Sequence, residues 1–149
     1  MSDLKWMLEA YQLAEKAQCL GEVPVGAVLV DEQDHLIGRG WNSVIQSTDP
    51  SAHAEMLALR EAAATIHNHR LCNTTLYVTL EPCCMCAGAL VQARVKRVVF
   101  ATRDLKAGAA GSRLNVLHGD LFNHAVMIDE GILQVECAAL LSQFFKVRR

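Results

Sequence analysis

The chain has 149 residues, of which 52% are hydrophobic and 20% charged, enough apolar material for one buried core. We therefore expect a single domain spanning residues 1–149. The formal net charge of −2 excludes a protein drawn to nucleic acid by its overall charge. The N-terminus lacks the basic start and apolar run of a signal peptide, and no stretch approaches the ~20 apolar residues that span a bilayer. These features favour a cytoplasmic protein without a membrane anchor.

The first half of the chain predicts a helix, a hairpin and a second helix. Apolar residues recur at helical spacing over residues 2–20, which indicates an amphipathic helix. The apolar runs 25–30 and 36–41 flank a polar turn and predict two paired strands. A polar loop then leads into a predicted helix over residues 52–66, with Ser51 as its N-cap.

The second half alternates strands and helices. We expect strands at residues 75–80, 95–101 and 124–129, and helices at residues 83–93, 115–123 and after Gly131. Small residues at 107–111 predict a loop that another group approaches closely. The alternation indicates an α/β fold, a three-layer αβα sandwich around a five-stranded mixed sheet that is largely parallel after the hairpin. In such sheets ligands bind at the strand ends where helices begin.

Six cysteines in a chain without an export signal are interpreted as thiols or metal ligands rather than disulfides. Three of them stand alone and are interpreted as inert thiols: Cys19, Cys72 and Cys137. The other three are crowded into residues 83–86. Cys83 and Cys86 are three residues apart, so their sulfurs face the same way on a helical turn. A helix N-terminus also favours the thiolate form that binds metal.

His53, at the start of the preceding helix, adds a nitrogen ligand to the two sulfurs. Mixed sulfur and nitrogen ligation favours zinc, and three protein ligands with one open position are typical of a catalytic zinc site. In that position a bound water ionises near neutral pH. The alternative is a closed structural site with Cys84 or another residue as fourth ligand. Cys84 directly follows Cys83, which makes simultaneous ligation of one ion by both awkward.

Glu55 decides between these two kinds of site. Residues two apart on a regular helix point about 200° apart, but in the first turn both His53 and Glu55 can lean past the helix end. A carboxylate placed there can take a proton from water and pass it on, which is general acid/base catalysis. The combination of H-x-E with a later P-C-x-x-C matches the zinc-deaminase signature.

The chain resembles the bacterial tRNA-specific adenosine deaminases, which convert the wobble adenosine of a tRNA anticodon to inosine. The similarity runs almost end to end, through EVPVGAVLV, DPSAHAEMLALR, TLYVTLEPCCMCAGAL, RVVFATRDLKAGAAGS and ECAALLSQFFKVRR. HAE and PCxxC identify only the superfamily, whereas RDLKAGAAGS and FFKVRR point to the tRNA-acting branch. The resemblance implies a cytidine-deaminase-like fold, one Zn²⁺ per subunit and a homodimer with the active site near the subunit interface.

The same resemblance implies residue roles. His53, Cys83 and Cys86 hold the zinc, and Glu55 shuttles protons while zinc-activated water attacks C6 of adenine and ammonia leaves. Contacts to the tRNA anticodon stem-loop are implied at Asn42, Ala54, Asp104, Phe145 and Arg148.

Several of these residues have plainer interpretations. Asn42 and Asp104 are also residue types typical of turns. Helical spacing favours Phe144 for the core, which leaves Phe145 on another face to meet RNA or a neighbouring subunit.

Two alternative functions stay open. The same zinc set would serve a free-base or nucleoside deaminase acting on cytosine, cytidine or guanine, because substrate choice lies in the pocket and loops. A zinc-stabilised RNA-binding module without catalysis is the alternative from another class, and in it Glu55 would be dispensable.

Overall fold

The computed structural model describes residues 2–119 and 123–148 of the chain. In chain order its elements are α1 (Ser2–Cys19), β1 (Gly26–Val30), β2 (Leu36–Trp41), α2 (Ala54–Ile66), β3 (Thr75–Leu80), α3 (Cys84–Gln92), β4 (Arg97–Thr102), the 3₁₀ turn η1 (Val116–His118), β5 (Met127–Glu130) and α4 (Gln134–Val147). In the part of the chain described, every helix is too short or too polar to cross a membrane.

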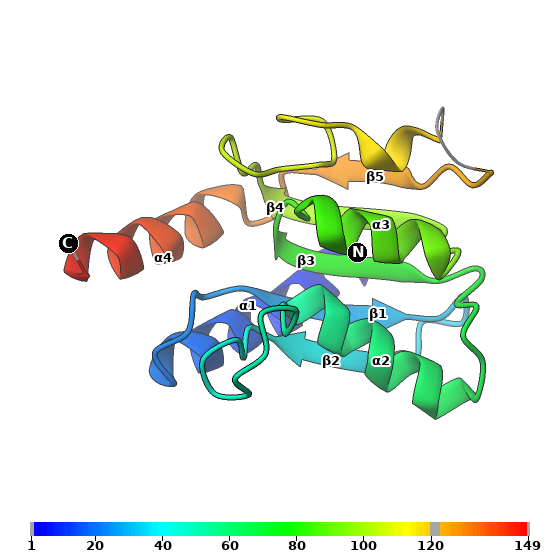
Figure 1. Cartoon of the computed structure of the whole chain (residues 1–149), viewed down its shortest axis with the longest axis horizontal. Coiled ribbons are helices and arrows are strands. Elements are labelled where there is room, and N and C mark those ends of the chain that lie inside the picture. The colour runs from blue at the N-terminus through cyan, green and yellow to red at the C-terminus, as the bar shows by residue number, and fades with distance from the viewer. Residues whose placement is uncertain (1, 120–122, 149) are drawn as a thin grey trace.

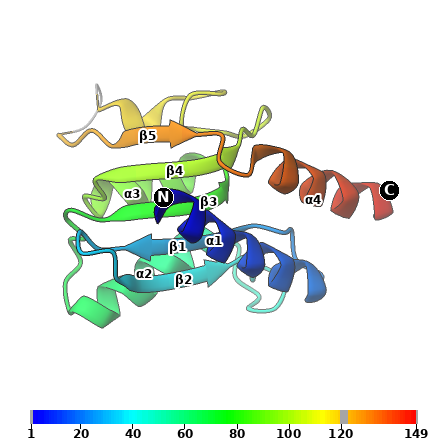
Figure 2. The ribbon, with the colours of Figure 1, turned by 180° about the vertical axis from the view of Figure 1, so that it is seen from behind.

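One five-stranded mixed sheet organises the molecule, as predicted. Its strand order is β2-β1-β3-β4-β5. β1 runs antiparallel to both of its neighbours, whereas β3, β4 and β5 are mutually parallel. Helices α2 and α3 cover one face and α1 and α4 the other (Figures 1 and 2). The three-layer αβα sandwich is therefore confirmed, with its parallel part confined to β3–β5.

Side chains of the central strands alternate between two hydrophobic cores. Leu29 and Val78 belong to the core beneath α2 and α3. Val28 and Tyr77 belong to the core beneath α1 and α4. This period of two is the geometry of a strand covered on both faces, and all five residues of β1 are buried. The layered packing fixes where the strands end and, with them, where the helices begin.

Close packing of α2 on β2 depends on glycine. A Cβ added at Gly40 would lie 2.8 Å from the backbone nitrogen of Ala58 and even nearer to the carbonyl oxygen of Ala54. Only a residue without a side chain permits that approach of helix backbone to strand. The contact holds the N-terminus of α2 against the end of β2.

Four predicted boundaries were wrong, and one of them is the start of β4, which lies at Arg97 rather than at residue 95. Helix α2 begins at Ala54 with His53 as N-cap, because the Ser51 hydroxyl donates to Asp49 Oδ1 (2.8 Å) and makes no cap. The helix predicted over residues 115–123 is reduced to η1, which ends at Gly119 with a φ of 93°; residues 120–122 lie outside the described part of the chain. The fifth strand begins at Met127 rather than at residue 124.

Arg97 ties the N-terminal helix to the parallel strands. Its guanidinium donates two hydrogen bonds to Asp3 (2.9 and 2.8 Å) and one to Asp129 (2.7 Å). Tyr77 Oη also donates to Asp3 (2.7 Å). Hydrogen bonding from Arg97 lowers the pKa of the Asp3 carboxyl from its usual 3.8 to about 2. The folded state therefore favours the ionised form of Asp3.

We predict that Arg97→Met lowers the free energy of unfolding by about 1–2 kcal/mol at neutral pH. The stabilisation from Asp3 is present above its ordinary pKa of 3.8 and is lost as the pH falls to about 2. The difference between wild type and variant, measured by urea unfolding, should therefore shrink across that interval. A difference that does not vary with pH would show that Arg97 acts through packing instead.

Candidate active site

The structure brings the three predicted metal ligands together at the start of two helices. His53 is the N-cap of α2, Cys83 is the N-cap of α3, and Cys86 lies in the first turn of α3. His53 Nδ1 lies 3.6 Å from Cys83 Sγ and 3.5 Å from Cys86 Sγ. Their ligand atoms all lie within 4.8 Å of one another. Helices α2 and α3 run side by side and begin at the same end of the sheet (Figure 1).

This donor set fits a zinc ion in both chemistry and spacing. A sulfur at ~2.3 Å and a nitrogen at ~2.0 Å from one tetrahedral zinc lie about 3.6 Å apart, which is the separation between His53 Nδ1 and each sulfur. Cys84, the alternative fourth ligand, is exposed and lies outside the group. Three ligands leave one coordination position for water or substrate, as in catalytic zinc sites.

The electrostatics of the two thiols favour an anion. Hydrogen bonding from Cys86 lowers the pKa of Cys83 to about 4, while the same contact and burial raise the pKa of Cys86. The pair thus carries one negative charge by itself, and a divalent cation would favour ionisation of the second thiol as well. Hydrogen bonding to Cys83 raises the pKa of His53, so proton release from the three ligands is linked to metal binding.

Glu55 lies beside these ligands and is only 4% exposed. His53 has extended backbone dihedrals (φ −74°, ψ 154°) and precedes the helix, so the 200° separation of a regular helix does not apply to this pair. Burial raises the pKa of the Glu55 carboxyl from 4.5 to about 7, and hydrogen bonding from Cys86 opposes the shift. A carboxyl near neutrality can both accept and donate a proton.

Asn42 connects the end of β2 to the start of α2. Its Oδ1 accepts a 2.9 Å hydrogen bond from the backbone N–H of Ala54, which satisfies one of the free donors at the helix end. Ala54 itself is fully buried, and its N–H is occupied by this bond. Asn42 therefore fixes the backbone between His53 and Glu55, and its amide group still carries two N–H donors.

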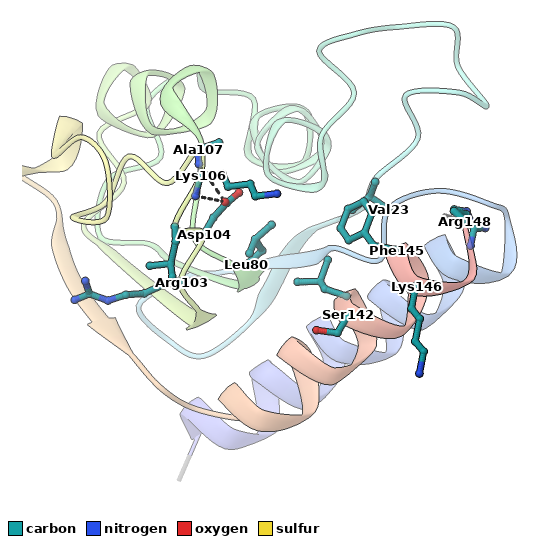
Figure 3. Close-up of a pocket in the computed structure, with 12 residues that line it drawn as sticks. Val23, Leu80, Arg103, Asp104, Lys106, Ala107, Ser142, Phe145, Lys146 and Arg148 are labelled. Carbon is teal, nitrogen blue, oxygen red and sulfur yellow. Dashed lines mark hydrogen bonds between the residues drawn. The ribbon is translucent and has the colours of Figure 1, made fainter.

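A groove of about 1080 Å³ lies between the loop after β4 and the C-terminal part of α4. The predicted contact residues Asp104, Phe145 and Arg148 all line it (Figure 3). Leu80, the last residue of β3, forms part of its wall and stands three positions before Cys83. The groove and the metal ligands thus share the end of one strand. Helix α4 extends past the sheet on the side where α2 and α3 begin (Figure 1).

The groove is lined by both apolar and charged side chains. Its charged residues are four cations and one carboxylate: Arg103, Lys106, Lys146, Arg148 and Asp104. In Figure 3 the Arg103 side chain points away from the groove, and its guanidinium pairs with Glu130 (2.8 and 2.9 Å). The Arg148 guanidinium stacks on the Phe144 ring at 3.6 Å. The local basic patch that the overall charge does not reveal is therefore present here.

Two predicted residues have the structural roles expected of their types. Asp104 Oδ1 accepts the backbone N–H groups of Lys106 and Ala107 (3.1 Å each), which is a turn-forming role even though the residue also lines the groove. Phe144 is 4% exposed and packs in the core, whereas Phe145 is 47% exposed. The prediction that separated these two rings by helical face is confirmed.

Glu81 was missed by sequence reasoning. It stands between β3 and Pro82, is 2% exposed, and accepts hydrogen bonds from the loop over residues 104–112. The available signal was a carboxylate directly after an apolar strand and two residues before a metal ligand. In TLYVTLEPCC, sequence reasoning assigned a strand and a metal ligand and gave the glutamate between them no role.

Comparison with known proteins identifies the family. Residues 1–102 match the model of the cytidine and deoxycytidylate deaminase zinc-binding region, and the chain belongs to this family of zinc-dependent deaminases. Within the family it falls among the tRNA-specific adenosine deaminases. It is 53% identical over 147 residues to the tRNA-specific adenosine deaminase of Haemophilus influenzae, covering 99% of this chain and 85% of that protein.

Two solved structures show the same fold. A structure from studies of A-to-I editing by tRNA:A34 deaminases at the wobble position has a TM-score of 0.88 and 36% identity, covering 92% of this chain and 99% of that one. Guanine deaminase from Nitrosomonas europaea has a TM-score of 0.81 and 26% identity, covering 95% of this chain and 83% of that one. The family's zinc-binding region and the His/Cys/Cys group assign zinc as the cofactor.

We predict that Cys86→Ser reduces the zinc content of the purified protein from about one ion per chain to near zero and lowers its melting temperature, because the site and the fold share these ligands. Metal analysis and thermal unfolding would measure both effects. Cys84→Ser is the matched control, since it removes a neighbouring exposed thiol and should leave the zinc in place. Loss of zinc from the Cys84 variant would indicate a four-ligand structural site.

Proposed function

We propose that this chain hydrolyses the wobble adenosine of a tRNA anticodon to inosine, with His53, Cys83 and Cys86 as zinc ligands and Glu55 as the proton shuttle. One observation carries the proposal: a buried carboxyl lies beside a three-ligand zinc set that leaves one position open. A structural zinc site has neither the open position nor a use for the carboxyl. The proposal also rests on the tRNA-specific adenosine deaminases that this chain resembles over nearly its whole length.

The bound zinc supplies Lewis acidity that makes water a nucleophile at neutral pH. Glu55 accepts the proton that this water loses and delivers it to the adenine ring nitrogen as the new C–O bond forms at C6. A second transfer through Glu55 protonates the amino group, the C–N bond breaks, and ammonia leaves while C6 keeps the oxygen. Because burial raises the pKa of Glu55 to about 7, the same group can serve as base and then as acid.

Substrate positioning in this proposal begins at Asn42. The hydrogen bond from Ala54 fixes its carbonyl oxygen, which turns the amide N–H groups toward other partners. A nucleoside offers oxygen and ring-nitrogen acceptors for such donors. Ala54, the other residue predicted to contact the base, lies between His53 and Glu55, is fully buried, and has its N–H bonded to Asn42.

The groove gives the proposed RNA substrate its second point of attachment. Unstacked bases of a single-stranded loop stack on exposed aromatic rings, and Phe145 offers such a ring at the groove. Lys106, Lys146 and Arg148 supply positive charge beside it for the phosphates. Arg148 is oriented by its stacking on Phe144, which reduces the freedom that the side chain loses on binding.

A free-base deaminase is the second candidate. It is favoured by the shared fold with a guanine deaminase at a TM-score of 0.81, since the same zinc chemistry serves both reactions. The relation is more distant in sequence, at 26% identity against 53% to a tRNA-specific relative. A pocket for a free base also has no need of a cationic groove with an exposed aromatic ring. The homodimer and the cytoplasmic location stay predictions from the resemblance and the sequence.

We predict that Glu55→Gln keeps zinc and RNA binding but lowers the rate of inosine formation by at least about 10³-fold, a typical loss for a general acid/base group. The assay is single turnover on an anticodon stem-loop with a wobble adenosine, with free adenosine, cytidine and guanine in parallel. Undiminished turnover in the variant would contradict the mechanism. Turnover of a free base or nucleoside by the wild type, with the RNA untouched, would favour the second candidate.

We predict that Phe145→Ala weakens binding of the same stem-loop by about tenfold, a value typical of the loss of one base–aromatic stacking contact. Zinc content and melting temperature should not change, because this ring is largely exposed. Binding is measured by titration with labelled RNA in the Glu55→Gln background, which prevents turnover. Unchanged RNA affinity would remove Phe145 from the proposed interface.

A further inference from the structure

We infer that Glu81 is a positioning residue for the RNA substrate, and that it acts by holding the loop over residues 103–112 against the turn that carries Cys83. This inference rests on the proposed function, because it assigns the loop to the engagement of RNA. Glu81 is the residue between β3 and Pro82 and does not belong to the metal set. It is neither one of the three metal ligands nor a lining residue of the groove, but it binds Asp104, which lines the groove.

The Glu81 carboxylate is the centre of a closed hydrogen-bond network. Its Oε1 accepts hydrogen bonds from the backbone N–H of Asp104 (3.1 Å) and from the Ser112 hydroxyl. Its Oε2 accepts the backbone N–H groups of Ala110 (2.9 Å) and Ser112 (3.0 Å). Four donors from both ends of the loop thus converge on one buried anion. Such charge-assisted bonds are stronger than bonds between neutral groups.

The loop packs directly on this carboxylate. A Cβ added at Gly108 would overlap the Glu81 carboxylate and also lie 2.5 Å from the carbonyl oxygen of Asp104. The same segment joins the metal turn, because Ala109 N donates to Pro82 O (2.8 Å) and Cys83 pairs with Gly108 in an antiparallel bridge. One rigid unit therefore contains a zinc ligand and a wall of the groove.

The position of Asp104 connects the loop that Glu81 holds with the proposed binding of RNA. Its backbone N–H is held by Glu81, and its carboxylate turns the chain so that Lys106 and Ala107 follow. All three of these loop residues line the groove. Glu81 thus sets the distance between the metal ligands and this wall of the groove, which is the distance that an RNA must span to place one base in the site and its neighbours in the groove. Misplacement of that wall affects RNA engagement before it affects the chemistry at the metal.

The test is Glu81→Gln, which keeps the shape of the side chain but leaves one oxygen to accept and adds N–H groups that face donors. With the stem-loop substrate we expect KM to rise about tenfold while kcat stays within about threefold. Zinc should remain at one ion per chain. Hydrogen exchange of the backbone amides of Asp104, Ala110 and Ser112, measured without RNA, should become faster.

Ser112→Ala is the milder second variant, because it removes only the hydroxyl donor, and it should raise KM in the same direction by a smaller factor. Arg97→Met is the matched stability control: it breaks an ion-pair cluster at the other end of β4 and should leave KM unchanged.

The inference is overturned if both Glu81→Gln and Ser112→Ala keep the wild-type KM and amide exchange, or if kcat falls while KM does not. An equal rise of KM in Arg97→Met would also overturn it, since the effect would then be general destabilisation. If Glu81→Gln does not fold, the KM and amide exchange of Ser112→Ala decide whether the inference holds. A wild-type protein that leaves the stem-loop untouched refutes the proposed function, and the exchange of the loop amides then decides alone whether Glu81 holds the loop.

Discussion

The structure depends on the meeting of two helix N-termini at one end of the sheet. Helices α2 and α3 follow different strands, yet their N-cap residues lie close enough for His53 Nδ1 to approach Cys83 Sγ to 3.6 Å. Glycines on β2 bring α2 down onto the sheet, and the pairing of β3 between β1 and β4 places the start of α3 beside it. Two positive helix ends facing one point favour anionic ligands there. The metal set is thus a consequence of how the layers pack.

Much of the architecture was predictable from sequence because each signal is local. β3 was predicted with its observed bounds, since β-branched and aromatic residues fill residues 75–80 between polar flanks. The zinc ligands were predictable because H-x-E and C-x-x-C are short motifs, and the spacing of their residues places the side chains on the same side of a helix start. Helix boundaries that depend on residues distant in the sequence were not predictable in this way. Ser51 has the side chain of an N-cap, but Asn42, twelve residues before Ala54, supplies the capping oxygen.

The groove needed the three-dimensional structure for a similar reason. Its walls come from the segment before β1, the end of β3, the loop after β4 and the last turns of α4, so its lining residues lie as much as 125 positions apart, from Val23 to Arg148. The net charge of −2 conceals the cations at this groove, Lys106, Lys146 and Arg148, because acidic residues elsewhere balance them. Family resemblance pointed to Asp104, Phe145 and Arg148 individually, but they share one surface because α4 extends past the sheet (Figure 1) and its last turns face the loop after β4 (Figure 3).

Two buried glutamates lie near the metal ligands, and the hydrogen bonds that each accepts indicate whether its role is structural or chemical. Glu81 accepts hydrogen bonds from four donors, two at each oxygen, so its carboxylate organises the backbone of the loop. Glu55 is equally buried, but burial outweighs the help that its own N–H and Cys86 give to the anion. A poorly stabilised buried carboxylate takes up a proton readily, which is the property that a proton shuttle needs. The sequence shows two identical side chains, and only the structure shows that one of them holds a loop through four donors while the other lies buried beside the metal ligands.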